Sequence, residues 1–298
     1  MKKLNLLLLL TFILVLGCAK SNLIAPGAKL VRAGAGFGSA EGPAVDKDGR
    51  IFFSDQMNDH IFIWEEGKGC SLWLEGTYRT NGMMFDKHGR LVVCAELNNE
   101  LAYFDSDKNY HLIASGYNGK LLNAPNDLWI TENDEYYFTD PYWQRDFWPQ
   151  DRTMEQDVKG VYFVNKDGEI KRVINDLIVP NGILGSPDGK SLYVSDMSGK
   201  ATWKYTMQPN GDLTDKTLVI KSGSDGMTID NLGNIYLTSM NTNMMRVRIF
   251  SPEGKLIHKI RVPESPTNIA FGGKDRDVLF ITAWSSVYTI KMNVKGVQ

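Results

Sequence analysis

Cysteine and histidine are scarce in this chain, and neither sign of charge dominates. It has three Cys, four His and a formal net charge of −2. The His residues are scattered, and no Cys/His spacing typical of a zinc site occurs, so a structural zinc centre is not expected. No basic stripe runs through the sequence either, which argues against nucleic acid as a partner.

Helical periodicity is almost absent as well. The apolar residues occur in short runs rich in β-branched and aromatic side chains, separated by turns that contain Asp, Asn and Gly. With 298 residues, the chain is long enough for one large domain or two small ones. Hydrophobic residues make up 43% of it, which is ordinary for a soluble globular protein. We therefore expect an all-β fold.

The first residues are typical of an export signal. Lys2 and Lys3 precede an apolar stretch that is short for a membrane-spanning helix. Residues 14–18 resemble a bacterial lipobox, so we expect residues 1–17 to be a lipoprotein signal peptide and Cys18 to be lipidated. The lipid would hold the protein at the bacterial cell envelope, with the outer membrane and periplasm as the expected location. A plain signal peptide and an uncleaved membrane anchor are the alternatives.

The rest of the chain divides into a tether and one folded domain. Residues 18–35 are predicted to be the tether, because they contain several Gly and few large apolar residues, and residues 36–298 to be the domain. Cys70 and Cys94 lie in or beside β-like runs. Free thiols are the interpretation we favour, while a disulfide stays open because the protein is exported.

A polar residue stands ten positions before each of six short apolar runs. Successive polar residues are 40, 45, 55, 44 and 43 positions apart. The six residues are Glu41, Asn81, Asn126, Asn181, Asp225 and Asn268. A repeat of roughly 40–50 residues with several short strands predicts a β-propeller.

Equivalent positions in the blades of a propeller face the same axis. The first five polar residues are therefore expected to meet at one end of the central channel. Carboxylate and amide oxygens are the ligands that a hard cation such as Ca²⁺ prefers. The alternative is structural, because Asn and Asp at turns often bond to their own backbone.

Five short motifs occur in order at this spacing. They are Glu41-Gly42-Pro43, Asn123-Ala124-Pro125-Asn126-Asp127, Tyr137-Phe138-Thr139-Asp140-Pro141, Pro180-Asn181-Gly182 and Ser224-Asp225-Gly226-Met227. Together they resemble the gluconolactonase / senescence-marker-protein / luciferin-regenerating-enzyme (SGL) family over residues 36–292. The resemblance implies a six-bladed β-propeller with a divalent cation in its central channel, and it implies lactone hydrolysis.

The resemblance also implies a site, residue by residue. Its metal ligands would be Glu41, Asn126, Asn181 and Asp225. Asp225 would also be the catalytic base or nucleophile, and Asn126 a fourth ligand or a substrate contact. Asn81 has the same phase but is not a standard ligand of the family, so a supporting hydrogen bond is expected of it. Ca²⁺ is the expected cation, with Mg²⁺, Mn²⁺ or Zn²⁺ as alternatives.

One departure bears on the substrate. Leu121 stands where gluconolactonase-like members often carry an Arg, so a cation able to hold a sugar hydroxyl or carboxylate is missing there. The expected function is a metal-dependent lactonase, a monomer acting on a small lactone or ester, with gluconolactone itself in doubt. The alternatives are a phosphotriesterase-like hydrolase in the same site and a non-enzymatic cell-envelope binding propeller.

Residues 142–157 form the longest interruption of the repeat. Insertions in a propeller map to loops on one face, so this one is expected to cover the channel mouth. Its Trp143 and Trp148 are predicted, together with Asn123 and Asn126, to contact the substrate. Packing of these aromatic residues against neighbouring blades is the alternative. Trp129 and Trp284 are expected in the core.

Overall fold

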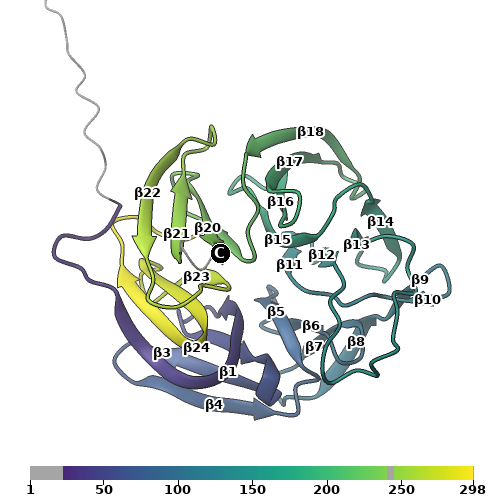
Figure 1. The fold of residues 1–298 in the computed structure, drawn as a ribbon, viewed down its shortest axis with the longest axis horizontal. Helices are drawn as coiled ribbons and strands as arrows, with labels where there is room; N and C mark the ends of the chain where they lie inside the picture. The colour runs from purple at the N-terminus through teal and green to yellow at the C-terminus, as the bar shows by residue number, and fades with distance from the viewer. Residues whose placement is uncertain (1–22, 240–244, 298) are drawn as a thin grey trace, which may run out of the picture.

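The computed structural model describes residues 23–239 and 245–297, and Figure 1 shows their sheets arranged in a ring. Within these ranges the only helix is the short 3-10 helix η1 (Gln56–Asn58), and every other regular element is a strand. No helix of the described residues is long and apolar enough to cross a membrane. The all-β propeller is confirmed, whereas the predicted signal peptide and Cys18 lie outside the described residues.

The second copy of the repeat shows how each unit folds. Its strands are β5 (Thr80–Phe85), β6 (Leu91–Ala95), β7 (Glu100–Phe104) and β8 (Tyr110–Ala114), paired antiparallel in that order. Between β5 and β6, the Asp86 carboxylate accepts the backbone N–H groups of His88 and Arg90 at 2.9 Å. Gly89 takes a φ of 78° in the same turn. The Asp/Gly turns therefore reverse the chain as expected.

Three more copies form four-stranded sheets of the same order. The third contains β11 (Leu128–Ile130), β12 (Tyr136–Asp140), β13 (Gly160–Val164) and β14 (Ile170–Ile174). The fourth contains β15 (Pro180–Gly185), β16 (Ser191–Asp196), β17 (Ala201–Met207) and β18 (Leu213–Ile220). The fifth contains β19 (Met227–Ile229), β20 (Ile235–Ser239), β21 (Arg246–Phe250) and β22 (Leu256–Arg261). A small sheet of β9 (Gly116–Tyr117) and β10 (Lys120–Leu121) precedes the third copy, and Figure 1 shows β5, β11 and β15 nearest the centre.

The first and last copies share one sheet, which corrects the prediction of six blades. This sheet has the order β23-β24-β1-β2-β3-β4. Its strands are β1 (Val31–Val45), β2 (Ile51–Asp55), β3 (His60–Glu65), β4 (Gly69–Glu75), β23 (Ile269–Gly272) and β24 (Val278–Lys291). The long β1 pairs with β2 through its second half and with β24 through its first half. The described residues therefore form five blades, because β1 joins two units of the repeat.

The folded region begins before residue 36. Leu23 is buried in an apolar cluster that includes Met292, and Ile24 forms a β-bridge with the same residue. The first residues of β1 pair with β24. The predicted tether is therefore wrong for residues 23–35, because this segment closes the ring by pairing with the last strand.

Apolar side chains of adjacent sheets form the core. One cluster joins Cys94 and Leu101 of the second copy to Phe138 and Tyr162 of the third. Cys94 is buried, Cys70 is partly buried, and both are free thiols. The interpretation as free thiols is confirmed.

A glycine follows four of the polar repeat residues and lets the inner strands approach closely. A Cβ added to it would collide with the polar residue of the next copy. These contacts are Gly42 with Asn81 (2.1 Å), Gly82 with Asn126 (2.5 Å), Gly182 with Asp225 (2.4 Å) and Gly226 with Asn268 (2.0 Å). The glycines thus keep the ring of polar residues narrow.

Candidate active site

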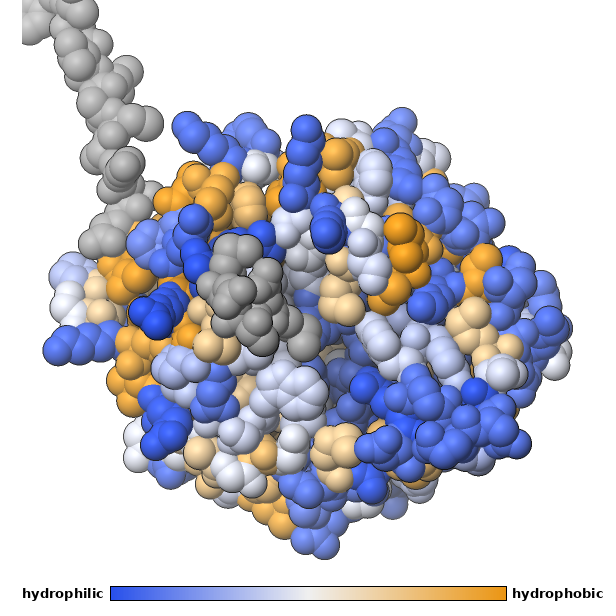
Figure 2. Space-filling view, in the orientation of Figure 1, coloured by the Kyte–Doolittle hydropathy of each residue, from blue (hydrophilic) through white to orange (hydrophobic). Residues whose placement is uncertain are grey.

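The polar residues of the repeat meet at one mouth of the channel. Five of them line a pocket with a volume of about 320 Å³. They are Glu41, Asn81, Asn126, Asn181 and Asp225. In the space-filling view along the channel, the surface is hollowed near its centre (Figure 2). The pocket therefore holds all four residues predicted to ligate a metal.

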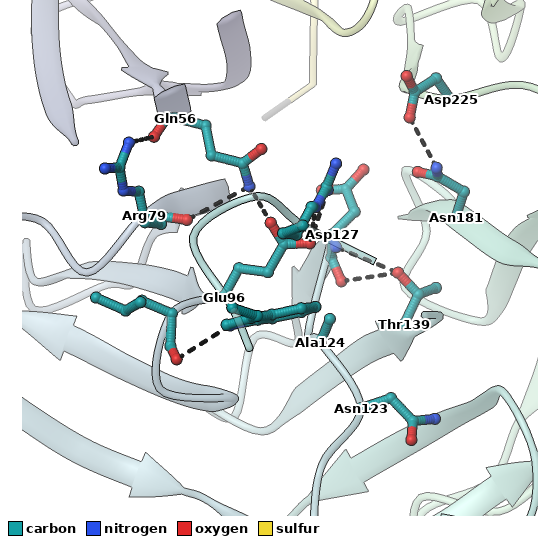
Figure 3. Close-up of polar contacts among 12 residues, drawn as sticks. Gln56, Arg79, Glu96, Asn123, Ala124, Asp127, Thr139, Asn181 and Asp225 are labelled. Carbon is teal, nitrogen blue, oxygen red and sulfur yellow. Dashed lines mark hydrogen bonds and ion pairs between the residues drawn. The ribbon is translucent and has the colours of Figure 1, made fainter. Parts of the chain in front are cut away.

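Asn181 and Asp225 come from neighbouring blades and bind each other. The Asn181 Nδ2 donates a hydrogen bond to Asp225 Oδ1 at 2.7 Å, as Figure 3 shows. Asn181 Oδ1 is buried and has no hydrogen-bond partner among the described residues. A buried oxygen without a partner is costly, so this amide is suited to a ligand that the protein itself does not supply.

Glu41 and Asp225 concentrate negative charge in the pocket. Burial raises the pKa of Glu41 well above its ordinary value, and the charge of Asp225 raises it further. Burial also raises the pKa of Asp225 to about 6, although the hydrogen bond from Asn181 acts in the opposite direction. Among the described residues, the Glu41 carboxylate accepts one weak hydrogen bond, from the N–H of Gly42 at 3.3 Å. A cation in the pocket would relieve this repulsion.

The insertion contributes a cation to the pocket wall. Arg145 lines the pocket and donates from Nε and Nη2 to Glu96 Oε1 at 3.0 and 2.7 Å. The Glu96 side chain is fully buried, and its other oxygen accepts a hydrogen bond from Gln56. Figure 3 shows Gln56 directed at Glu96. The insertion is thereby held against the second blade, as the predicted covering of the channel mouth requires.

Two of the four predicted substrate contacts line the pocket and two do not. Asn126 and Trp143 belong to its wall, whereas Asn123 and Trp148 do not. The Asn123 side chain donates to the Val158 carbonyl at 3.0 Å. Trp148 is buried, and the Arg152 guanidinium carbon lies over its ring, 3.4 Å from the ring centre. Trp148 also donates from Nε1 to the Leu97 carbonyl of the second copy at 3.4 Å. Both side chains therefore hold the loop in place, and we do not propose them further as substrate contacts.

Trp284 lines the pocket, although the sequence placed it in the core. Its side chain is 47% exposed, and its φ is 47°, a backbone conformation that bulky residues rarely adopt. Ser285 and Ser286 follow Trp284, and their hydroxyls donate hydrogen bonds to the Glu264 carboxylate. Both serines lie within β24, and this polar pair in an otherwise apolar run was the available signal that Trp284 is not a core residue.

Asp140, at the end of β12, supports the segment that leads to Asn126. Its carboxylate accepts the backbone N–H groups of Asn123 and Ala124 at 2.9 and 2.8 Å. Burial raises the pKa of Asp140 to about 7. Asp196 binds the N–H groups of Ile178 and Val179 in the same way, ahead of Asn181. By binding the backbone just before Asn126 and Asn181, these two carboxylates position the polar residues that line the pocket.

Asn268 does not join the ring. It lines a separate small cavity of about 60 Å³ within the channel, together with Asp127. Burial raises the pKa of Asp127 to about 7. Its Oδ1 accepts the N–H of Leu128 at 2.9 Å. Asp127 thus faces this small cavity and not the pocket of the ring.

The donor set of the pocket fits a hard divalent cation. In residues 23–239 and 245–297 no three His, Cys, Asp or Glu side chains form a metal-binding group. The pocket instead combines two carboxylates with amides, one of which has the buried, unpartnered oxygen of Asn181. Oxygen donors of this kind suit Ca²⁺ or Mg²⁺ better than zinc.

These features define an all-β propeller with a carboxylate-lined pocket at the mouth of its channel. The chain belongs to the family described as "SMP-30/Gluconolactonase/LRE-like region", which matches residues 39–285. A gluconolactonase of Zymomonas mobilis is 28% identical over 287 residues, which cover 86% of this chain and 79% of that protein. A 6-deoxy-6-sulfogluconolactonase of Pseudomonas putida is 30% identical over 150 residues, 47% of this chain and 50% of that protein.

Solved structures show the same fold. A gluconolactonase from Xanthomonas campestris superposes with a TM-score of 0.82 at 26% identity, covering 91% of this chain and 94% of its own. Regucalcin of Agrobacterium tumefaciens, a calcium-binding protein, has a TM-score of 0.75 at 18% identity, covering 92% and 95%. At that identity the second likeness shows the fold alone.

Proposed function

We propose that this protein is a divalent-metal-dependent hydrolase that opens lactone rings. The observation that carries the proposal is the meeting of Glu41, Asn126, Asn181 and Asp225 in one pocket. Relatives named as gluconolactonases support the reaction class. We propose Ca²⁺ as the cation, because every ligand in this set binds through oxygen.

These four residues would hold the cation. When bound, it would polarise the lactone carbonyl and stabilise the negative charge that develops on the carbonyl oxygen. Asn181 has a second task, because its N–H group orients the Asp225 carboxylate. The pocket wall of Trp143 and Trp284 would exclude bulk water from one side of the substrate.

The reaction adds one water across a cyclic ester. In total one water is consumed, the acyl C–O bond of the ring breaks, and the departing ring oxygen takes up a proton, which gives a hydroxy acid. Asp225 acts either as the base that takes a proton from the attacking water or as the nucleophile that attacks the carbonyl carbon. As the nucleophile, the Asp225 carboxylate bonds to the carbonyl carbon, the ring C–O bond breaks, and water then hydrolyses the resulting anhydride. After a single turnover in ¹⁸O-labelled water, label in the Asp225 side chain identifies this route, because it enters when water attacks the Asp225 carbon of the anhydride.

A substrate panel tests the function. Purified protein with saturating Ca²⁺ is offered sugar lactones, aliphatic lactones and a phosphotriester. We expect turnover of lactones, reduced about 100-fold or more in Asp225→Asn. Asp188→Asn is the matched control, because Asp188 is an exposed turn residue that does not line the pocket. Hydrolysis of the phosphotriester alone, or of no substrate by the folded and metal-loaded protein, would overturn the lactonase assignment.

We also propose that a lipid on Cys18 holds the protein at the cell envelope. The support is the lipobox-like sequence of residues 14–18. Metabolic labelling with an alkyne fatty acid should mark the wild type and not Cys18→Ser. Equal labelling of both proteins would contradict the anchor.

A further inference from the structure

We propose that Arg145 determines substrate specificity by binding a hydroxyl substituent of the lactone. This inference rests on the proposed lactonase function and adds a residue that the polar repeat does not contain. Arg145 belongs to the insertion, and it is the only Lys or Arg among the described residues that lines the pocket. Leu121, which stands at the position of a family Arg, is exposed and does not line the pocket.

Arg145 is held in a defined orientation. Two of its nitrogens donate to one oxygen of the buried Glu96, and its guanidinium lies 5.6 Å from the ring centre of Trp143, another pocket residue. The Arg145 side chain is 25% exposed to solvent, and it lines the pocket. Nη1 is not used by Glu96, so the guanidinium keeps donors for a ligand.

The guanidinium also lies close to the reacting region. Arg145 lines the same pocket as Glu41 and Asp225. A substrate between these carboxylates and Trp143 therefore lies within reach of Arg145. The position is suited to a substituent of the lactone ring rather than to the carbonyl group.

The charge balance favours a hydroxyl over an anion. Glu96 pairs with Arg145 and offsets its charge, while Glu41 and Asp225 would offset the two charges of the proposed Ca²⁺ in the same pocket. An anionic substituent would gain little attraction from such a site. A hydroxyl oxygen can accept an N–H bond from the guanidinium and donate to a neighbouring amide oxygen.

The rest of the insertion is anchored independently of Arg145. The Gln156 side chain donates to the carbonyls of Tyr117 and Leu121 at 3.1 and 2.9 Å. Asp157 pairs with Arg172 at 2.5 Å. Removal of the Arg145 head group should therefore leave the loop in place.

The test measures the hydrolysis of two six-membered lactones by the Ca²⁺-loaded protein and compares their kcat/KM values. D-glucono-δ-lactone carries ring hydroxyls and δ-valerolactone carries none. In Arg145→Met we expect kcat/KM for the hydroxylated lactone to fall about tenfold or more through KM, with a change of less than about threefold for δ-valerolactone. The control is Arg79→Met, because Arg79 also contacts the insertion, at 5.2 Å from the Phe147 ring centre, but does not line the pocket. Equal losses on both lactones in Arg145→Met, or no loss on either, would overturn the inference.

A binding measurement separates this inference from the proposed function. If the wild type hydrolyses neither lactone, the lactonase function fails, and binding of gluconate and of 5-hydroxyvalerate is then followed by tryptophan fluorescence. Gluconate binding that Arg145→Met weakens about tenfold, with 5-hydroxyvalerate unaffected, supports the role of Arg145. Equal gluconate binding by both proteins, or no binding by the wild type, contradicts it.

Discussion

Asn181 donates its amide N–H to Asp225 Oδ1 at 2.7 Å, and this bond turns the Asn181 oxygen toward a buried position without a protein partner. Because the donor is engaged, the amide presents its oxygen to whatever occupies the pocket. The pair therefore prepares a ligand oxygen before any ligand arrives. Its geometry links two blades to one candidate metal site.

Removal of this amide should weaken cation binding. We expect Asn181→Ala to lower the affinity for Ca²⁺ by about tenfold or more, since it removes both a ligand oxygen and the group that orients Asp225. Isothermal titration calorimetry of the chelator-treated protein measures the effect. Asn210→Ala is the control, because Asn210 is exposed and donates to Asp212 at a distant turn. Equal Ca²⁺ affinity of Asn181→Ala and wild type would remove Asn181 from the site.

The close approach of inner strands at Gly182 predicts a large effect of a single methyl group. A Cβ at this position would lie 2.4 Å from the Asp225 carbonyl oxygen, so β15 and the next blade must separate. We expect Gly182→Ala to lower the free energy of unfolding by about 2 kcal/mol or more and to reduce Ca²⁺ affinity as well.

Gly189→Ala is the control for that substitution. Gly189 lies in the turn between β15 and β16, has a φ of 65° and has open space where a Cβ would point. Its substitution should cost about 1 kcal/mol of unfolding free energy, from backbone strain alone, with unchanged Ca²⁺ affinity. Denaturant unfolding and calorimetry give both quantities. A Gly182→Ala variant no less stable than Gly189→Ala would contradict the close packing.

Trp284 is expected to lower the stability of the fold through its backbone conformation and to contribute to substrate binding. Its φ of 47° is unfavourable for a bulky side chain, while Asn tolerates this conformation. We expect Trp284→Asn to raise the melting temperature or leave it unchanged, and to raise KM severalfold because one wall of the pocket is lost. Calorimetric melting and lactone kinetics test the two effects separately. A variant with unchanged KM would show that Trp284 does not contact the substrate.

Asp140 should make the protein less stable as the pH rises from 4 to 7. Burial raises its pKa from the ordinary 3.8 to about 7, so the folded protein holds a proton that the unfolded chain releases in this range. The free energy of unfolding therefore falls with increasing pH, by up to about 1.4 kcal/mol per pH unit from this group. Asp140→Asn should lose that part of the slope.

The Asp140 variant is checked by urea unfolding at several pH values. Asn keeps one oxygen for the N–H groups of Asn123 and Ala124, so a uniform loss of about 1–3 kcal/mol is also expected. That uniform loss is independent of pH and does not obscure the slope. Identical pH dependence in wild type and variant would mean that Asp140 is ionised throughout this range.

The ring of polar residues was predictable from the sequence, and the pocket wall was not. A fixed offset in a propeller repeat places Glu41 or Asn181 on the channel axis whatever the loops do. Arg145 reaches Glu96 across 49 positions of sequence through an irregular loop, and no periodic pattern encodes such a contact. Trp284 was missed for a related reason, because the register of β24 against β1 shifts between Ala35 and Ala40, the partner of Trp284, and the apolar run does not encode that shift.

The prediction of six blades was wrong because of the two ends of the chain. The repeat pattern marks six copies, but it carries no information on hydrogen bonds between the first and the last of them. β1 pairs with both β2 and β24, so two copies share one sheet. The same pairing explains why residues 23–35 are folded, although their composition resembles a tether.

The most direct test of the central claim is whether lactone hydrolysis is lost when the metal is removed and regained when Ca²⁺ is restored. Proton release from the lactone that the substrate panel shows to be turned over fastest is followed at constant pH with the wild type, first as purified, then after EDTA treatment, then after Ca²⁺ is restored. The proposed site predicts that EDTA lowers the rate about 100-fold or more, and that Ca²⁺ restores it to a protein that has stayed folded. A metal-free, folded protein that hydrolyses the lactone at the original rate would contradict the account.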